Sequence, residues 1–256
     1  MSPEDFAAHL AEARASGTMA PVDLDLIVDP GEAERVLAAA GTAYGGRAVG
    51  YKIGCTSPLA CQIVGAPGPF FAPMVDRDLF QDGAILPWKP QYRGVECEFA
   101  FRMARAYPAP GDKVEMEGLR RAVASCHLAL EMVGRRTQGE GLPRYPGLVA
   151  DFGAHCAFVL GPEIRGWADR DLAGVRVTGL LDGEATNEGS GAAVMGGPLN
   201  ALLWLAEALV ERGRRLEEGD YVSTGTTLGV VKAQKGTTVR SVFEDIGEVS
   251  LVFAAA

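Results

Sequence analysis

The chain has 256 residues, of which 48% are hydrophobic and 22% are charged, and its formal net charge is −9. This length suits one large domain with a sizeable core, and the acidic charge argues against nucleic acid as a partner, because nucleic-acid binders present a basic face. An acidic protein that binds an anionic substrate needs a local source of positive charge, which a bound cation would supply.

The cysteine pattern and the N-terminus indicate the compartment. The five cysteines are odd in number and scattered, and no CxxC pair occurs, which is typical of reduced thiols in a cytosol. The acidic start, Ser2 to Asp5, lacks the apolar stretch of a signal peptide. The sequence contains no run of 18 apolar residues, so no membrane-spanning helix is expected. We therefore expect a cytoplasmic protein without a membrane partner.

The first 45 residues are predicted to be a helical N-terminal region. Ser2, Pro3 and Asp5 have the spacing of a helix start with a capping box, and Gly17 can end that helix. A second helix is expected from Pro30 to about Gly41. A strand is expected at 47–54, and the stretch 65–90, which is rich in Gly and Pro, is predicted to be a long loop with short extended pieces.

The remainder of the chain is predicted to be rich in strands. We expect strands at 94–103, 129–133, 156–160 and 175–181, helices at 115–130 and 199–212, and short strands at 221–223, 228–232, 238–243 and 248–253. This order does not repeat a βαβ unit, so the sequence predicts a mixed α+β fold. No linker-like boundary interrupts it, and residues 1–256 are therefore expected to form one domain.

Two glutamates on one predicted strand suggest a metal site. Glu96 and Glu98 are separated by one residue, so both side chains point to the same face of an otherwise apolar strand. Like charges in such surroundings need a compensating cation, and hard divalent ions accept carboxylate ligands. Glu131, also in an apolar segment, is a candidate third ligand. An exposed edge strand with Glu131 paired to a nearby arginine would give the same pattern.

Other polar residues have both a functional and a structural interpretation. Lys52 lies in an apolar segment and either reaches the surface or serves a buried anion. Asp76 and Arg77 lie in the predicted loop, where they could equally form a self-paired turn. The turns at Ser190 and at 224–227 could bind an anion through free N–H groups or could simply be tight. No HExxH motif occurs, which argues against catalytic zinc.

Five segments, in order, resemble the 2-keto-4-pentenoate hydratases of the fumarylacetoacetate hydrolase superfamily. YKIGCTS at 51–57 is similar to their YKIGLTS, and VECEFAF at 95–101 is similar to their VEAEIAF. ALEMV with two following arginines, at 129–136, resembles their ALEIVDSR. The segment 189–205 resembles their GSGAAVLGHPLNAVAWLA, and 220–253 resembles their last β-rich stretch.

This resemblance implies a fold, a cofactor and site residues. The fold would be the superfamily's mixed β-roll with peripheral helices, and Glu96, Glu98 and Glu131 would bind Mg²⁺ or Mn²⁺. Lys52 would be a catalytic residue, joined by Asp76, which fits the first of two family aspartates. The candidates for substrate binding are Arg77, Asp151, Ser190, Thr224 and Gly225.

The chain departs from the hydratases at three places. Arg77 occupies the position of the second aspartate that the hydratases have in this loop. Where the hydratases have ADNAS, this chain has ADFGA at 150–154, and where they have GHP, it has GGP at 196–198. An arginine can bind a second carboxylate in a forked geometry. Arg77 therefore predicts a preference for substrates with a distal acidic or strongly polar group.

The predicted function is a hydratase that adds water to a 2-hydroxy-dienoate or 2-oxo-4-enoic acid in catabolism of small organic acids or aromatics. A hydrolase of acylpyruvates and a 2-oxo acid decarboxylase remain open, because all three reactions pass through an enolate that a metal can stabilise. A further alternative is a non-catalytic partner subunit. It is less favoured, because such a subunit would not need three carboxylates in apolar surroundings. The expected partners are a small 2-oxo acid and further copies of the chain.

Overall fold

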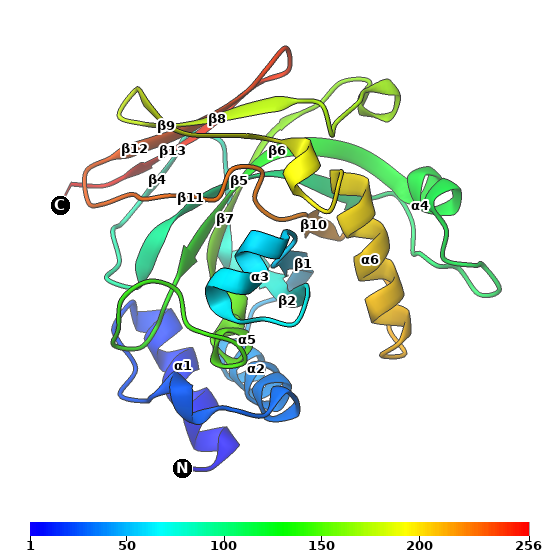
Figure 1. The fold of residues 1–256 in the computed structure, drawn as a ribbon. Coiled ribbons are helices and arrows are strands. Elements are labelled where there is room, and N and C mark those ends of the chain that lie inside the picture. Colours follow the sequence, from blue (N-terminus) through cyan, green and yellow to red (C-terminus); the bar gives the residue numbers. More distant parts are fainter. Residues whose placement is uncertain (256) are drawn as a thin grey trace.

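Two β-sheets packed against each other, with helices at the periphery, make up the computed structural model, which describes residues 1–255 (Figure 1). The larger sheet has the order β2-β1-β10-β5-β6-β7-β3, and β11 also pairs with β5. Its strands are β1 Ala48–Gly54, β2 Phe70–Val75, β3 Leu79–Gln81, β5 Tyr92–Met103, β6 Val123–Gly134, β7 His155–Glu163, β10 Tyr221–Ser223 and β11 Val230–Val231.

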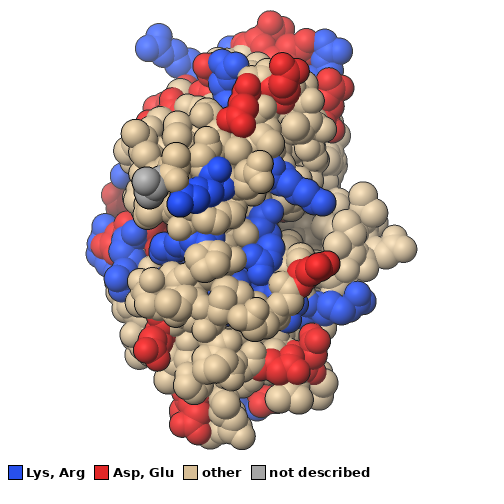
Figure 2. All heavy atoms as spheres, turned by 90° about the vertical axis from the view of Figure 1, so that its left-hand side faces the viewer, with Lys and Arg blue, Asp and Glu red and all other residues tan. Residues whose placement is uncertain are grey.

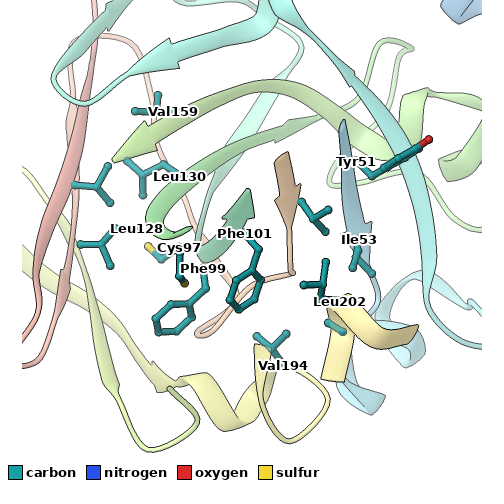
Figure 3. Close-up of a cluster of buried hydrophobic side chains, with 14 of the residues drawn as sticks. Tyr51, Ile53, Cys97, Phe99, Phe101, Leu128, Leu130, Val159, Val194 and Leu202 are labelled. Carbon is teal, nitrogen blue, oxygen red and sulfur yellow. The ribbon is translucent and has the colours of Figure 1, made fainter. Parts of the chain in front are cut away.

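The smaller sheet has the order β4-β13-β12-β8-β9 and packs on one face of the larger one. Its strands are β4 Ala84–Leu86, β8 Arg176–Leu181, β9 Glu184–Ser190, β12 Thr238–Phe243 and β13 Gly247–Phe253. The rings of Phe99 on β5 and Phe243 on β12 meet edge to face at 5.1 Å. Figure 3 shows Phe99, Phe101, Leu128 and Leu130 within this core. The fold is α+β, as predicted.

The helices cover the outside of the sheets. The α-helices are α1 Pro3–Ser16, α2 Pro30–Tyr44, α3 Pro58–Val64, α4 Met116–Ala122, α5 Gly147–Ala150 and α6 Pro198–Val210, and the 3₁₀ turns are η1 Leu24–Leu26, η2 Asp76–Asp78, η3 Phe152–Ala154, η4 Trp167–Asp169 and η5 Gly191–Ala193. The capping box of Ser2 and Asp5 and the left-handed Gly17 delimit α1 as expected. Helices α1 and α2 pack beside α5, away from the smaller sheet (Figure 1).

The predicted helix at 115–130 is wrong in its second half. Helix α4 ends at Ala122, and the chain continues directly into the twelve-residue strand β6. Strand β6 lies between β5 and β7 and is covered on both faces, so its apolar residues do not alternate with polar ones. The stretch 65–90, predicted to be a loop with short extended pieces, contains the short strands β2, β3 and β4 joined by irregular segments and the turn η2. Helix α3 and strand β9 were not predicted.

Helix α6 is the apolar helix that packs on the larger sheet. Together with the preceding turn, Gly191–Val210 is long and apolar enough to cross a membrane by composition alone. Its Val194, Leu202 and Leu205 are fully buried, and Figure 3 places Val194 and Leu202 near Phe101 and Ile53. Core helices of globular proteins pass the same composition test, so this helix is weak evidence for a span.

The surface charge is unevenly distributed. On the face turned toward the viewer in Figure 2, Lys and Arg side chains gather across the middle, and Asp and Glu lie mainly above and below them. The net charge of −9 therefore coexists with a locally basic band.

Candidate active site

Three carboxylates converge where strands β5 and β6 pair. The antiparallel register sets Glu96 directly opposite Glu131, and Glu98 follows two residues along β5 on the same face. One oxygen from each of the three side chains lies within 4.8 Å of the others. Glu98 and Glu131 are fully buried, and Glu96 is partly accessible. The exposed-edge interpretation of these residues is therefore excluded by the structure.

Each buried carboxylate is held on one side by hydrogen bonds. Oε2 of Glu98 accepts from the Ser223 hydroxyl and, at 2.8 Å, from the backbone N–H of Gly225. Gly225 has φ +102°, and a Cβ there would collide with the side chain of Thr56, so this close approach requires glycine. Oε1 of Glu131 lies 2.8 Å from His155 Nδ1 and 3.4 Å from Lys52 Nζ.

The ionisation of these groups follows from burial and from their neighbours. Burial raises the pKa of Glu96 to about 7, with a further contribution from Glu131, and raises the pKa of Glu98 well above its usual value. Burial also acts to raise the pKa of Glu131, but Lys52 and His155 outweigh it and hold that pKa below its usual value. Burial lowers the pKa of Lys52, but the three carboxylates outweigh it and raise that pKa overall.

His155 orients Glu131. Burial lowers the pKa of His155, although Glu131 partly offsets this. Because an ionised carboxylate can only accept, Nδ1 carries a hydrogen and donates a hydrogen bond to Glu131. Its Nε2 has no hydrogen-bond partner. A ring that donates to a carboxylate ligand fixes that ligand's direction.

The donor set fits a divalent cation of the hard type. Oε1 of Glu98 and Oε2 of Glu131 are buried and have no hydrogen-bond partner. Buried carboxylate oxygens are nearly always paired, so two unpaired ones beside a third carboxylate indicate ligand positions. Three oxygen ligands leave about half of an octahedral shell for substrate and water.

A cavity of about 480 Å³ opens beside this cluster. Lys52 and Glu96 line it, together with Thr226 and Thr227 from the segment after β10. Its other walls come from α3, from Phe70 on β2 and from the segment around 142–154. The buried, charged groups and a concave space thus occur together, as in small-molecule sites.

The structure does not bring Asp76 and Arg77 to this cavity. Asp76 accepts from the backbone N–H of Arg47 and lies 3.6 Å from its guanidinium at the surface. Arg77 donates to the carbonyl of Tyr44 at 2.8 Å, and its guanidinium lies over the Tyr44 ring. Neither side chain lines the cavity, so the expected roles in catalysis and in recognition of a distal acid have no geometric basis.

The other candidate substrate ligands also lie elsewhere or have another role. Asp151 is fully buried, binds the backbone and guanidinium of Arg136, and does not line the cavity. The hydroxyl of Thr224 donates to the carbonyl of Phe99. Ser190 is outside the lining, although its neighbour Gly189 belongs to it. Gly225 contributes through its N–H to Glu98 and not through the cavity wall.

The sequence did not reveal several supporting residues. His155, Ser223 and Phe70 are not among the site residues predicted from the sequence. A histidine or serine at a strand end carries no local pattern, since its partner lies 24 residues away for His155 and 125 residues away for Ser223. Tertiary structure alone joins them to Glu131 and Glu98.

Known proteins match this chain over nearly its full length. A family model described as fumarylacetoacetate (FAA) hydrolase C-terminal matches residues 81–253. A 2-keto-4-pentenoate hydratase of Burkholderia vietnamiensis is 33% identical over 97% of this chain and 96% of its own, and one of Paraburkholderia phymatum is 32% identical over 98% and 97%.

A solved structure shares the fold. The 4-oxalocrotonate decarboxylase of Pseudomonas putida G7, described as complexed with magnesium and adipate, superposes with a TM-score of 0.87 at 22% identity, covering 98% of this chain and 97% of that one. At this identity the likeness concerns the fold. The sequence matches show that the chain belongs to the fumarylacetoacetate hydrolase family and, within it, to the 2-keto-4-pentenoate hydratase family.

Proposed function

We propose that this protein is a divalent-metal-dependent hydratase that adds water to a 2-hydroxy-2,4-dienoate in the catabolism of small organic or aromatic acids. The observation that carries the proposal is the cluster of Glu96, Glu98 and Glu131, with two unpaired buried oxygens, beside Lys52 in one cavity. The hydratases that resemble this chain over its full length support the reaction type.

The three glutamates would hold Mg²⁺ or Mn²⁺. Both ions prefer oxygen ligands in octahedral geometry to histidine or thiolate. The cluster of candidate ligands consists of three carboxylates and contains no histidine or cysteine. When bound, the cation supplies positive charge that stabilises the enolate form of a 2-oxo acid. The decarboxylase that shares the fold is described with magnesium.

The chain's own groups perform the remaining tasks. Lys52 is the one cationic side chain among the described residues that line the cavity, and its Nζ can donate a proton to a dienolate carbon or orient the incoming water. Protonation at C5 turns the dienol into a conjugated 2-oxo-3-enoate, and water then adds at C4 while a proton goes to C3. His155 and Ser223 keep the glutamates in position, and the apolar walls limit access of bulk water.

The assembly and the compartment are further parts of the proposal. The five scattered cysteines, a pattern typical of reduced thiols, favour the cytoplasm. We also propose that the chain forms a homo-oligomer that takes a small 2-oxo acid and no nucleic acid.

The experiment is an ultraviolet assay of purified protein with 2-hydroxypenta-2,4-dienoate, with added Mg²⁺ or Mn²⁺ and with EDTA. We expect metal-dependent loss of the dienol absorbance and a 4-hydroxy-2-oxo acid as the product by NMR. Release of CO₂ from a diacid substrate, or carbon–carbon cleavage of an acylpyruvate without hydration of the dienol, would replace the hydratase by a decarboxylase or a hydrolase.

A further inference from the structure

The cavity is larger than a five-carbon dienoate requires. Its volume of about 480 Å³ is that of roughly sixteen water molecules, at about 30 Å³ each in the liquid. Pockets for drug-sized ligands fall in the range of roughly 300–1,000 Å³. Once the reacting end of a short substrate is placed beside Lys52, most of this space is left for something else.

The walls of the remaining space are mainly apolar. Helix α3 and the segments that face it supply aliphatic and aromatic side chains: Leu59, Ala60, Ile63, Val64, Phe70, Val133, Leu142, Leu148, Leu228 and Val230. Several of these pack into one hydrophobic cluster, centred on the buried Val64, Val133 and Leu148. The cavity therefore has a formed apolar wall.

This wall begins directly at the reacting end. The Nζ atom of Lys52 lies 5.4 Å from the centre of the Phe70 ring, and Phe70 also packs against the apolar cluster. At the rim, Leu59 and Ile63, one helical turn apart on α3, line the cavity and remain 66% and 63% exposed. Exposed large aliphatic residues at a cavity mouth are well placed to be covered by a ligand.

The charges around the cavity disfavour an acidic tail. The only charged residues among the described lining are Lys52, Glu96 and Glu188, and Lys52 is already paired with Glu131. Glu188 is exposed and would repel a second carboxylate. No arginine of residues 1–255 lines the cavity, which removes the forked partner that a diacid substrate would need.

We propose that the α3 wall is a binding site for an apolar tail, so that the preferred substrates are 2-hydroxy-2,4-dienoates with an unbranched alkyl substituent of several carbons at C5. This inference rests on the proposed hydratase function for the reacting end and replaces the sequence-based prediction of a distal acid. Leu59 and Ile63 are the specificity-determining residues at its outer end.

The first test compares kcat/KM for dienoates whose C5 substituent is hydrogen, methyl, propyl or pentyl, and for one that ends in a carboxylate. Alkyl groups beyond methyl hardly change the reactivity of the diene, so differences report binding. A buried methylene contributes about 0.8 kcal/mol, which is about fourfold per methylene. We expect kcat/KM to rise by about this factor for each added methylene, hence by about 15-fold from methyl to propyl, which adds two. It should be lower for the carboxylate than for the alkyl substrate of equal length.

The second test removes the outer wall. In Leu59→Gln combined with Ile63→Gln, the gain per methylene should fall below about twofold. Both side chains are largely exposed, so these changes do not disturb the core. Ile85→Gln is the matched control, because Ile85 is 72% exposed on β4 and does not line the cavity. It should keep the wild-type dependence on chain length.

A third measurement separates this inference from the proposed function. Saturated 2-oxopentanoate and 2-oxooctanoate cannot be hydrated, and their affinities in the presence of Mg²⁺ can be measured by calorimetry. If no dienoate reacts but the longer 2-oxo acid binds at least tenfold more tightly, the hydratase function fails and the tail site stands. If dienoates are hydrated with equal kcat/KM at all lengths, or the carboxylate-ended substrate is preferred, the tail site is overturned.

Discussion

At the scale of single residues, the site depends on how each buried charge is partnered. Lys52 is 2% exposed, has the fully buried Glu131 as its ion-pair partner, and is one of the residues that line the cavity. A lysine that only carried its charge to the surface would be exposed at its tip. The interpretation that Lys52 reaches the surface is therefore wrong, and its charge lies beside the carboxylates and the cavity.

Replacement of Lys52 tests its role in proton transfer. Lys52→Met keeps the length of the side chain and removes the proton donor, so kcat should fall by roughly 10²-fold or more, with a smaller change in KM. The measurement is steady-state kinetics on metal-saturated protein. An unchanged kcat in a folded variant would assign Lys52 to charge balance alone.

Arg77 gives the opposite expectation. Its guanidinium is held by the carbonyl and the ring of Tyr44, on the N-terminal side of the molecule and not in the cavity. Arg77→Ala should therefore change the ratio of kcat/KM for alkyl and carboxylate-ended dienoates by less than about twofold, and lower stability by about 0.5–1 kcal/mol. A large shift in that ratio would restore Arg77 as a residue that recognises the substrate.

At the scale of elements, a buried ion pair joins the N-terminal helices to the sheet. Arg14 on α1 donates to Asp78 of η2 at 2.7 Å, and Asp78 also accepts from the Tyr44 hydroxyl on α2. Arg14 is 3% exposed and packs between the rings of Tyr44 and Phe152. This contact links α1, α2 and the turn before β3.

Removing one partner of this pair leaves a charge without compensation. Arg14→Met should lower the free energy of unfolding by about 3–5 kcal/mol, because Asp78 would remain buried without its cation. Urea denaturation measures the change. The matched control is Arg176→Met, which breaks the exposed pair with Glu244 and should have a much smaller effect on the free energy of unfolding, because solvent screens that pair. Equal effects for the two variants would contradict this account.

At the scale of the whole molecule, the proposed metal site predicts that metal binding and folding are coupled. The three carboxylates come from strands in the middle of the larger sheet, so the site exists only when β5 and β6 are paired. A cation that binds only the folded chain stabilises it by mass action, by about 2.7 kcal/mol at 100 times its Kd. Removal of the ion should therefore lower both activity and stability.

The test compares unfolding with Mg²⁺ and with EDTA. Wild type should gain about that amount from the metal, whereas Glu98→Gln should lose both the gain and the metal-dependent activity while it stays folded. Glu248→Gln, at an exposed position on β13, is the control and should behave as wild type. Metal dependence at the wild-type level in Glu98→Gln would remove that residue from the ligand set.

The sequence by itself determined the elements whose signals are local. The caps of α1, the apolar stripe of α6, the short strands of the tail and the alternation of Glu96 and Glu98 are all encoded within a few residues. The segments that resemble the hydratases, which occur in the same order, supported Lys52 and Glu131 as site residues. These residues were therefore identified before any contact was known.

Only the tertiary structure decided which residues meet. The local sequence of β6 predicts that helix α4 continues. The segment is a strand because β5 and β7 form hydrogen bonds with its backbone groups on both sides. The sequence predicted site roles for Asp76, Arg77 and Asp151, but each of them binds a partner away from the cavity. Conversely, His155 and Ser223 are distant in sequence from Glu131 and Glu98 but contact them in the structure. The physical reason is that partners of buried charges are fixed by packing across the sheet, which sequence spacing does not record.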